Sequence, residues 1–287
     1  MLLWLCEPDE SFHFLGIGAD DTLRAIRHVD AEFGRILAVH EGEIDAGRLQ
    51  VIALSDHGQI SLKGQPLDLV AKFRAAGFAA AAKPSEDAEC VVDVGNAGGI
   101  WVRGSPGDRI DKIVDWIREQ EWCGPIFTRN GVSGTLLQKH LGVDHRRSPD
   151  ISVVLRSDDA TNDWGLKGTT LHDAVYPAGG GCHGGLSTYE LHNVLAMSGG
   201  AFKQGQIIEV PAGNIDIAPT ILALLGLDVP DGIDGRVLRE ALRENDESAT
   251  LEVVEHVYSS SNANGLASHL SVSEFGGSRY LNRAWVA

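Results

Sequence analysis

Apolar residues follow two spacings along the chain, and each spacing predicts one kind of element. Short apolar runs bounded by turn residues predict buried strands, which lie at residues 2–6, 48–54, 125–131, 149–157 and 193–199. Apolar positions that recur every three or four residues predict helices, which lie at residues 20–37, 66–78, 107–122, 214–227 and 234–245. Strands that alternate with helices are typical of an α/β fold, with a mostly parallel sheet and helices on both faces.

Further segments complete this prediction. Residues 88–95 and 99–104 indicate a hairpin-like pair, and residues 251–287 indicate an antiparallel C-terminal ribbon at the sheet edge. Residues 157–190 are polar and rich in glycine without a clear period, which is typical of a functional or disordered segment. Because no linker interrupts the pattern, we expect residues 1–287 to form a single domain.

The composition limits the classes of partner. The chain has 287 residues, of which 43% are hydrophobic and 22% are charged, and this is enough for a sizeable core. Its formal net charge of −16 repels polyanions, so we expect no duplex nucleic acid as a partner. A small phosphate ester stays compatible with this charge, because a bound metal ion dominates its local field. No apolar run reaches the ~20 residues of a membrane helix, so we expect no membrane segment.

The number and spacing of the cysteines indicate the redox environment of the protein. The chain contains Cys6, Cys90, Cys123 and Cys182. They form no C-x-x-C pair, which argues against a thiolate zinc site. Scattered thiols in a chain of this length favour a reducing compartment such as the cytoplasm. The first residues lack the basic start of a signal peptide, although an upstream segment would hide any export signal.

Acidic and imidazole side chains stand together where two predicted strands end. Asp9 follows the first strand and His13 comes four residues later, so one helical turn would point both side chains the same way. Asp56 and His57 directly follow the second strand. Because ligands of open α/β sheets bind at the carboxyl ends of strands, we expect these pairs to lie close together. Carboxylate and imidazole suit zinc, manganese or iron, and His183, which lies among glycines, is a further candidate ligand.

Each pair alone is also compatible with a solvated polar loop, but the motifs follow one another in a recognisable order. They are PDESFH at 8–13, LSDHGQI at 54–60, GCHGGLSTYELHNVLAMSGGAFKQG at 181–205 and NIDIAPTILALLGL at 214–227. This ordered set resembles the type I phosphodiesterase/nucleotide pyrophosphatase family of the alkaline phosphatase superfamily. The resemblance runs from about residue 1 to about residue 243.

The resemblance implies an alkaline-phosphatase-like fold and two divalent metal ions, with zinc as the usual metal and manganese as the alternative. Asp9, His13 and His183 would hold one ion. Asp56 and His57 would hold the other, together with a further Asp and a nucleophilic Thr or Ser. In such enzymes the hydroxyl attacks the phosphorus of a phosphate ester and forms a covalent intermediate, which water then hydrolyses. A sulfatase-like or phosphomutase-like relative would share the same metal frame.

The chain departs from the family at the nucleophile. In the family, the extra Asp and the nucleophile precede the Asp-x-x-x-His element, and this sequence starts at the predicted strand that delivers Asp9. No nucleophile is assigned, because the possible substitutes lack the family's order and context; they are Ser55, Ser133, Thr135, Ser148, Asp158 and Asp159. We therefore expect the C-terminal portion of a longer enzyme, without its N-terminal strand and helix. A second polypeptide or another copy of the chain could instead supply that half, or the protein could be a non-catalytic metal-binding homologue.

Overall fold

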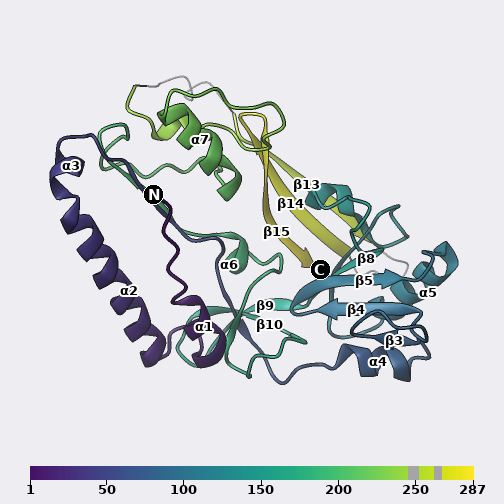
Figure 1. The fold of residues 1–287 in the computed structure, drawn as a ribbon. Coiled ribbons are helices and arrows are strands. Elements are labelled where there is room, and N and C mark those ends of the chain that lie inside the picture. Colours follow the sequence, from purple (N-terminus) through teal and green to yellow (C-terminus); the bar gives the residue numbers. More distant parts are fainter. Residues whose placement is uncertain (245–251, 262–266) are drawn as a thin grey trace.

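The computed structural model describes residues 1–244, 252–261 and 267–287, where helices combine with four β-sheets (Figure 1). The α/β class expected from the sequence is confirmed. The helices are α1 (Asp9–Leu15), α2 (Asp20–Val39), α3 (Glu41–Asp45), α4 (Leu69–Ala75), α5 (Gly107–Arg118), α6 (Thr188–Leu191) and α7 (Ile217–Leu224). Short 3-10 turns are η1 (Gln138–Leu141), η2 (Asn214–Asp216) and η3 (Arg239–Ala241). No helix in these ranges combines the length and the apolar character that a membrane crossing requires.

The strands are distributed over sheets of different sizes. The largest has the order β3 (Ala80–Ala81), β4 (Cys90–Val94), β5 (Ala97–Val102), β8 (Ile151–Leu155), β6 (Cys123–Thr128) and β7 (Leu136–Leu137). A second has the order β11 (Gly181–Cys182), β2 (Ile60–Leu62), β10 (Lys167–Thr170) and β9 (Ser157–Thr161). The two-stranded sheet joins β1 (Val51–Leu54) and β12 (Leu195–Ser198). The three-stranded sheet joins β13 (Val254–Ser261), β14 (Ala267–Phe275) and β15 (Ser278–Val286).

Alternating side chains of the central strands build the core of the six-stranded sheet. Ile126 of β6 and Val153 of β8 belong to one buried cluster with residues of α4 and α5. Their neighbours Phe127 and Val154 belong to a second cluster with residues of β14 and β15. Because successive side chains of a strand point to opposite faces, this sheet is buried on both sides. Helices cover one face and the C-terminal sheet covers the other, which corrects the expectation of helices on both faces.

The sheets are mostly antiparallel, and the prediction of a mostly parallel sheet is wrong. The pairs β3–β4, β6–β7 and β2–β10 are parallel, and the other strand pairs of the described chain run antiparallel. For strands that follow one another in the chain, the cause is the length of the connection. β4 and β5 are joined by Gly95 and Asn96 alone, and so short a link can only reverse the chain. Residues 157–190, which have no visible period, contain β9 and β10 as a further hairpin.

The C-terminal ribbon expected from the sequence is present and antiparallel. It forms a sheet of its own that packs over the six-stranded sheet, rather than extending the edge of that sheet. Residues 251 and 262–266 of the predicted ribbon lie outside the described residues.

The buried strand predicted at residues 2–6 does not form. These residues adopt no regular structure and pair with no strand in the described ranges. Leu2 is 96% exposed and Trp4 is 80% exposed. Their apolar character favours burial, but a strand also needs a neighbour to bond its backbone groups.

The helix predicted at residues 234–245 is also wrong, because the described part, which ends at 244, contains only the turn η3. The backbone N–H of Arg236 donates to the Asp216 carboxylate, and that of Leu238 donates to the Thr220 hydroxyl. The Leu238 N–H, which a helix over these residues would bond to the carbonyl of Asp234, is thus taken by a side chain of α7.

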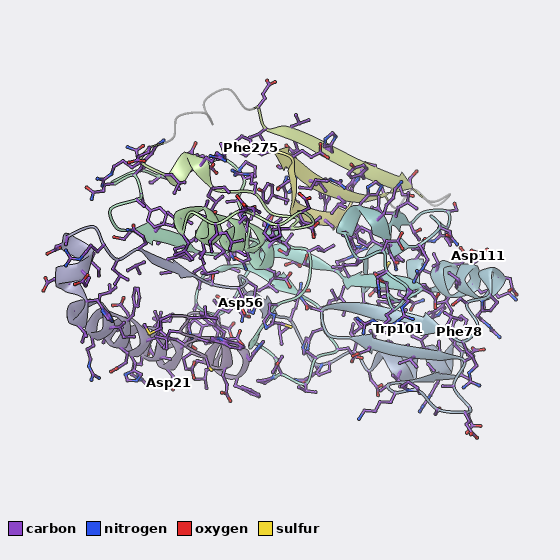
Figure 2. All side chains as sticks on the ribbon, turned by 45° about the horizontal axis from the view of Figure 1, so that its top comes forward. Asp21, Asp56, Phe78, Trp101, Asp111 and Phe275 are labelled. Carbon is purple, nitrogen blue, oxygen red and sulfur yellow. The ribbon has the colours of Figure 1, made fainter. Side chains whose placement is uncertain are left out.

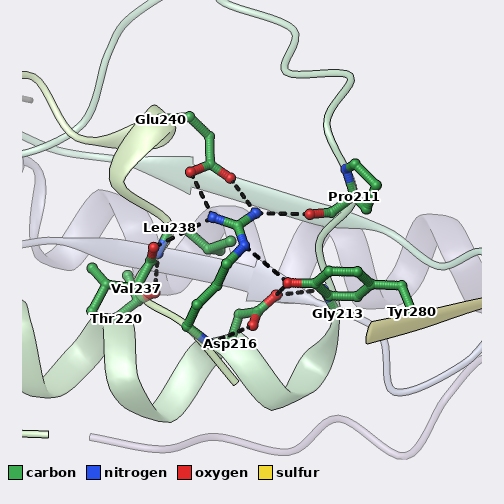
Figure 3. Close-up of polar contacts among 9 residues, drawn as sticks. Pro211, Gly213, Asp216, Thr220, Val237, Leu238, Glu240 and Tyr280 are labelled. Carbon is green, nitrogen blue, oxygen red and sulfur yellow. Dashed lines mark hydrogen bonds and ion pairs between the residues drawn. The ribbon is translucent and has the colours of Figure 1, made fainter. Parts of the chain in front are cut away.

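A buried polar network centred on Arg236 joins η2, η3 and β15 (Figure 3). The guanidinium donates to both carboxylate oxygens of Glu240, at 2.8 and 2.7 Å, and to the Tyr280 hydroxyl at 3.0 Å. Tyr280 in turn donates to Asp216 at 3.0 Å. Burial, and then the neighbouring Asp216, raise the pKa of Tyr280 to about 12, so this hydroxyl keeps the proton that it donates.

Replacing Arg236 with Met should lower the free energy of unfolding by about 3–5 kcal/mol, because Glu240 then stays buried without its ion-pair partner. Arg239→Met, three residues further on and exposed to solvent, is the control and should change stability by less than about 0.5 kcal/mol. Urea unfolding followed by circular dichroism measures both. Equal stabilities of the two variants would contradict this account of the network.

Candidate metal centre

Three predicted ligands converge beside α1. Asp9 and His13 lie four residues apart on α1, and His183 follows the last residue of β11. Their ligand atoms all lie within 4.8 Å of one another. His13 Nε2 is 3.3 Å from Asp9 Oδ2, and His183 Nε2 is 3.7 Å from Asp9 Oδ1. Tetrahedral zinc with bonds of about 2.0–2.1 Å sets its ligand atoms ~3.3 Å apart, so the spacing and the donor types fit such an ion.

The imidazole of His13 is fixed by its surroundings. Its Nδ1 lies 2.8 Å from the carbonyl oxygen of Gly181, which can only accept, so Nδ1 carries the proton and Nε2 keeps its lone pair. The ring is buried and stacks on Tyr176, with centroids 3.9 Å apart and planes inclined by 10°. These contacts set both the tautomer and the orientation that a metal ligand needs.

His183 joins the three-residue group to the second predicted pair. Its ring stacks on that of His57, with centroids 3.5 Å apart. Burial lowers the pKa of His183, and His57 lowers it further, which favours the neutral ring whose nitrogen can bind a metal.

Asp56 and His57 lie just after β1, as the sequence indicates, and form an adjacent pair. His57 Nε2 is 3.4 Å from Asp56 Oδ1, and His57 Nδ1 donates to the Gly58 carbonyl at 3.0 Å. The Asp56 side chain is 70% exposed, and Figure 2 shows it between α2 and the six-stranded sheet. In the described ranges, no third His, Cys or carboxylate completes a second three-ligand group around this pair.

A buried carboxylate, Glu190 of α6, holds the loop that carries His183. It accepts from Asn96 Nδ2 at 2.5 Å, from the Gly185 N–H at 2.7 Å and from the Ser187 N–H at 3.3 Å. Burial raises the pKa of Glu190 even though these three donors oppose the shift. The same residue accepts the Gly58 N–H on its backbone carbonyl at 2.7 Å. α6 therefore ties the His57 segment and the His183 loop to one support.

The polar residues considered as substitute nucleophiles are engaged elsewhere. Ser55 Oγ accepts from the Val194 N–H at 3.0 Å, and Thr135 Oγ1 donates to the Val132 carbonyl at 2.6 Å. The Asp158 carboxylate accepts from Lys63 and Thr169. These contacts agree with leaving the nucleophile unassigned.

Some residues that shape the site were not singled out by the sequence, namely Gln59, Asn96, Tyr176 and Glu190. A signal existed for Glu190, because the S-x-x-E pattern at residues 187–190 is a capping box, and that box forms at α6. The others act through contacts between residues far apart in the chain, for which the sequence carries no local signal.

Replacing Gly58 with Ala tests how tightly α6 holds this segment. A Cβ at residue 58 would overlap the carbonyl oxygens of Tyr189 and His192, so the free energy of unfolding should fall by about 1–3 kcal/mol. Gly34→Ala on α2 meets no neighbouring atom and should raise stability by up to ~1 kcal/mol, because alanine favours a helix. Chemical denaturation of both variants is the measurement. Shifts of the same sign would argue against the close packing at Gly58.

The comparisons with known proteins bear on this arrangement. The family model described as type I phosphodiesterase/nucleotide pyrophosphatase matches residues 1–168, which is more than half of the 287 residues. The matched region contains Asp9, His13, Asp56 and His57 and ends before His183. A search of the curated proteins finds no match. On the extent of the family match, this chain belongs to the type I phosphodiesterase/nucleotide pyrophosphatase family.

Proposed function

We propose that the chain carries a metal centre of a phosphoester hydrolase, in which Asp9, His13 and His183 hold one divalent ion, zinc or manganese. The observation that carries this proposal is the convergence of their ligand atoms to within 4.8 Å. Membership of the family supports the reaction type, since the family is one of phosphoester hydrolases. The substrate class that follows is a small phosphate ester, and its identity depends on loops around the site.

The residues of the chain have distinct tasks in this proposal. A bound ion would stabilise charge on phosphoryl oxygens and lower the pKa of a coordinated hydroxyl or water. Asp9 supplies negative charge from the first turn of α1, and His13 supplies Nε2 because Gly181 holds its other nitrogen. His183 closes the group from the end of β11.

We further propose that Asp56 and His57 are part of a second metal position, which a complementary polypeptide segment completes with a carboxylate and a nucleophilic hydroxyl. The exposure of Asp56 and the contact between the rings of His57 and His183 support a neighbouring, open position. Exposed apolar side chains support a covering segment, because such patches mark interaction surfaces. They include Leu2, Leu3 and Trp4, and Leu23 and Ile26 of α2.

Zinc binding by the purified chain tests the first metal position. The wild-type chain should bind one zinc ion, and His183→Ala should weaken binding by at least about 100-fold, because one of three ligands is lost. Asp56→Asn should weaken it by less than about tenfold, because Asp56 lies outside the three-residue group. Competition with a chromophoric chelator measures the affinity. His28→Ala is the control, because His28 is an exposed residue of α2. If His28→Ala and His183→Ala weakened zinc binding equally, His183 would not be a ligand.

Hydrolysis of bis-p-nitrophenyl phosphate tests the reaction type. We expect slow, metal-dependent release of p-nitrophenol that EDTA abolishes, because in this proposal a complementary segment supplies the nucleophilic hydroxyl. Efficient turnover by the pure chain would show instead that the nucleophile lies within it. Faster hydrolysis of p-nitrophenyl sulfate would favour a sulfatase-like relative. If no substrate analogue raises the melting temperature of the zinc-bound chain, the protein is a non-catalytic homologue.

A further inference from the structure

Gln59 reaches from one motif of the site to a ligand of the other. It lies two residues after His57, and its side-chain Nε2 donates to Asp9 Oδ1 at 2.5 Å. The two residues are 50 positions apart in the chain. The oxygen that accepts this bond is also the one that lies 3.7 Å from His183 Nε2. The other oxygen, Oδ2, is the one that lies 3.3 Å from His13 Nε2.

The carbonyl oxygen of the Gln59 amide group lies in an energetically unfavourable environment. Gln59 Oε1 is buried and has no hydrogen-bond partner among the described residues. It lies against the backbone of Gly181, where an added Cβ would be 3.1 Å from it. Rotating the amide would place a carbonyl oxygen against the Asp9 carboxylate, where two acceptors repel each other, so the orientation is set by the bond to Asp9. A buried polar atom left without a partner destabilises the fold, and its presence calls for an explanation.

We propose, on the basis of the metal centre proposed above, that Gln59 is a positioning residue that fixes the rotation of the Asp9 carboxylate. By holding Oδ1, the amide keeps Oδ2 directed toward His13, so the carboxylate is oriented before an ion arrives. The Asp9 side chain is 45% exposed, and without this bond it would be free to turn toward solvent. Outer-shell hydrogen bonds of this kind orient ligands in metal sites generally.

An amide suits this task better than a charged donor. Lys or Arg at the same place would also donate to Asp9, but the positive charge would repel a divalent ion and offset the charge of the carboxylate. Gln59 donates without a net charge, so Asp9 keeps its full attraction for a cation. The pairing of β2 with β11 ends at Ile60 and Cys182. Gln59 and His183, the adjacent residues along the chain, therefore lie at the same end of the two strands, and both are close to Asp9.

The substitution Gln59→Met separates a positioning role from a structural one. Met has a similar volume but removes both the donor to Asp9 and the unpartnered oxygen. We expect zinc affinity, measured with the zinc ion alone against a chromophoric chelator, to fall by about 10–100-fold. The melting temperature of the metal-free chain should stay unchanged or rise. A loss of affinity smaller than about tenfold, or a loss accompanied by a lower melting temperature, overturns the proposal.

Gln138→Met is the matched control. Gln138 is fully buried, and its Oε1, like that of Gln59, is buried without a partner in the described ranges, but its Nε2 bonds Pro149 and Ser152 away from the site. Gln138→Met should lower the melting temperature and leave the zinc affinity within about twofold of the wild-type value. Equal losses of zinc affinity in Gln59→Met and Gln138→Met would overturn the proposal. If the wild-type chain binds no zinc, the proposed function fails and this inference with it. If the wild type binds zinc and Gln59→Met binds it equally well, only the role of Gln59 fails.

Discussion

The short antiparallel pairing of β2 with β11 is the contact on which the site depends. It places Cys182 opposite Ile60, so that segments about 120 positions apart in the chain lie side by side at the same end of the two strands. His57 and His183 can stack only because this register brings their segments together. The carbonyl of Gly181, in the same short strand, then fixes the tautomer of His13. A shift of one residue would turn the side chains of β11 to the other face and disperse the group.

Support for this register comes from polar contacts that are themselves buried. Glu190 receives three donors and holds the loop after β11, while its backbone carbonyl binds the Gly58 N–H after β1. The segments that carry His57 and His183 therefore both contact α6, a helix of only four residues. A carboxylate with several donors is costly to bury but has a defined geometry, since its bonds join the Asn96 side chain to the backbone at Gly185 and Ser187. The rigidity of the site thus follows from the same contacts that fold it.

The sequence predicts which side chains converge, namely Asp9, His13 and His183, better than it predicts the frame that holds them. Asp9 and His13 are visible because a four-residue spacing on a helix is a local property, and α1 forms as that spacing requires. The roles of Gln59 and Asn96 cannot be predicted from the local sequence, because these side chains contact residues 50 and 94 positions away. The alternation of strands and helices likewise does not specify pairing direction, and only where the link is very short, as between β4 and β5, is the antiparallel direction forced. Residues 2–6 show the same limit, since apolar character does not supply a neighbouring strand.

The two halves of the site differ in how much order they possess before a ligand binds. The ring of His13 is buried, stacked and bonded, and Asp9 is held by Gln59, so an ion that binds there orders few side chains. The Asp56 side chain is 70% exposed, and its Oδ1 lies 3.4 Å from Nε2 of His57. Ordering a free side chain costs about 0.5–1.5 kcal/mol, and that cost is subtracted from the affinity of whatever binds. The three-residue group is therefore the position with the lower cost of ordering, and the exposed pair depends on additional contacts to bind with comparable strength.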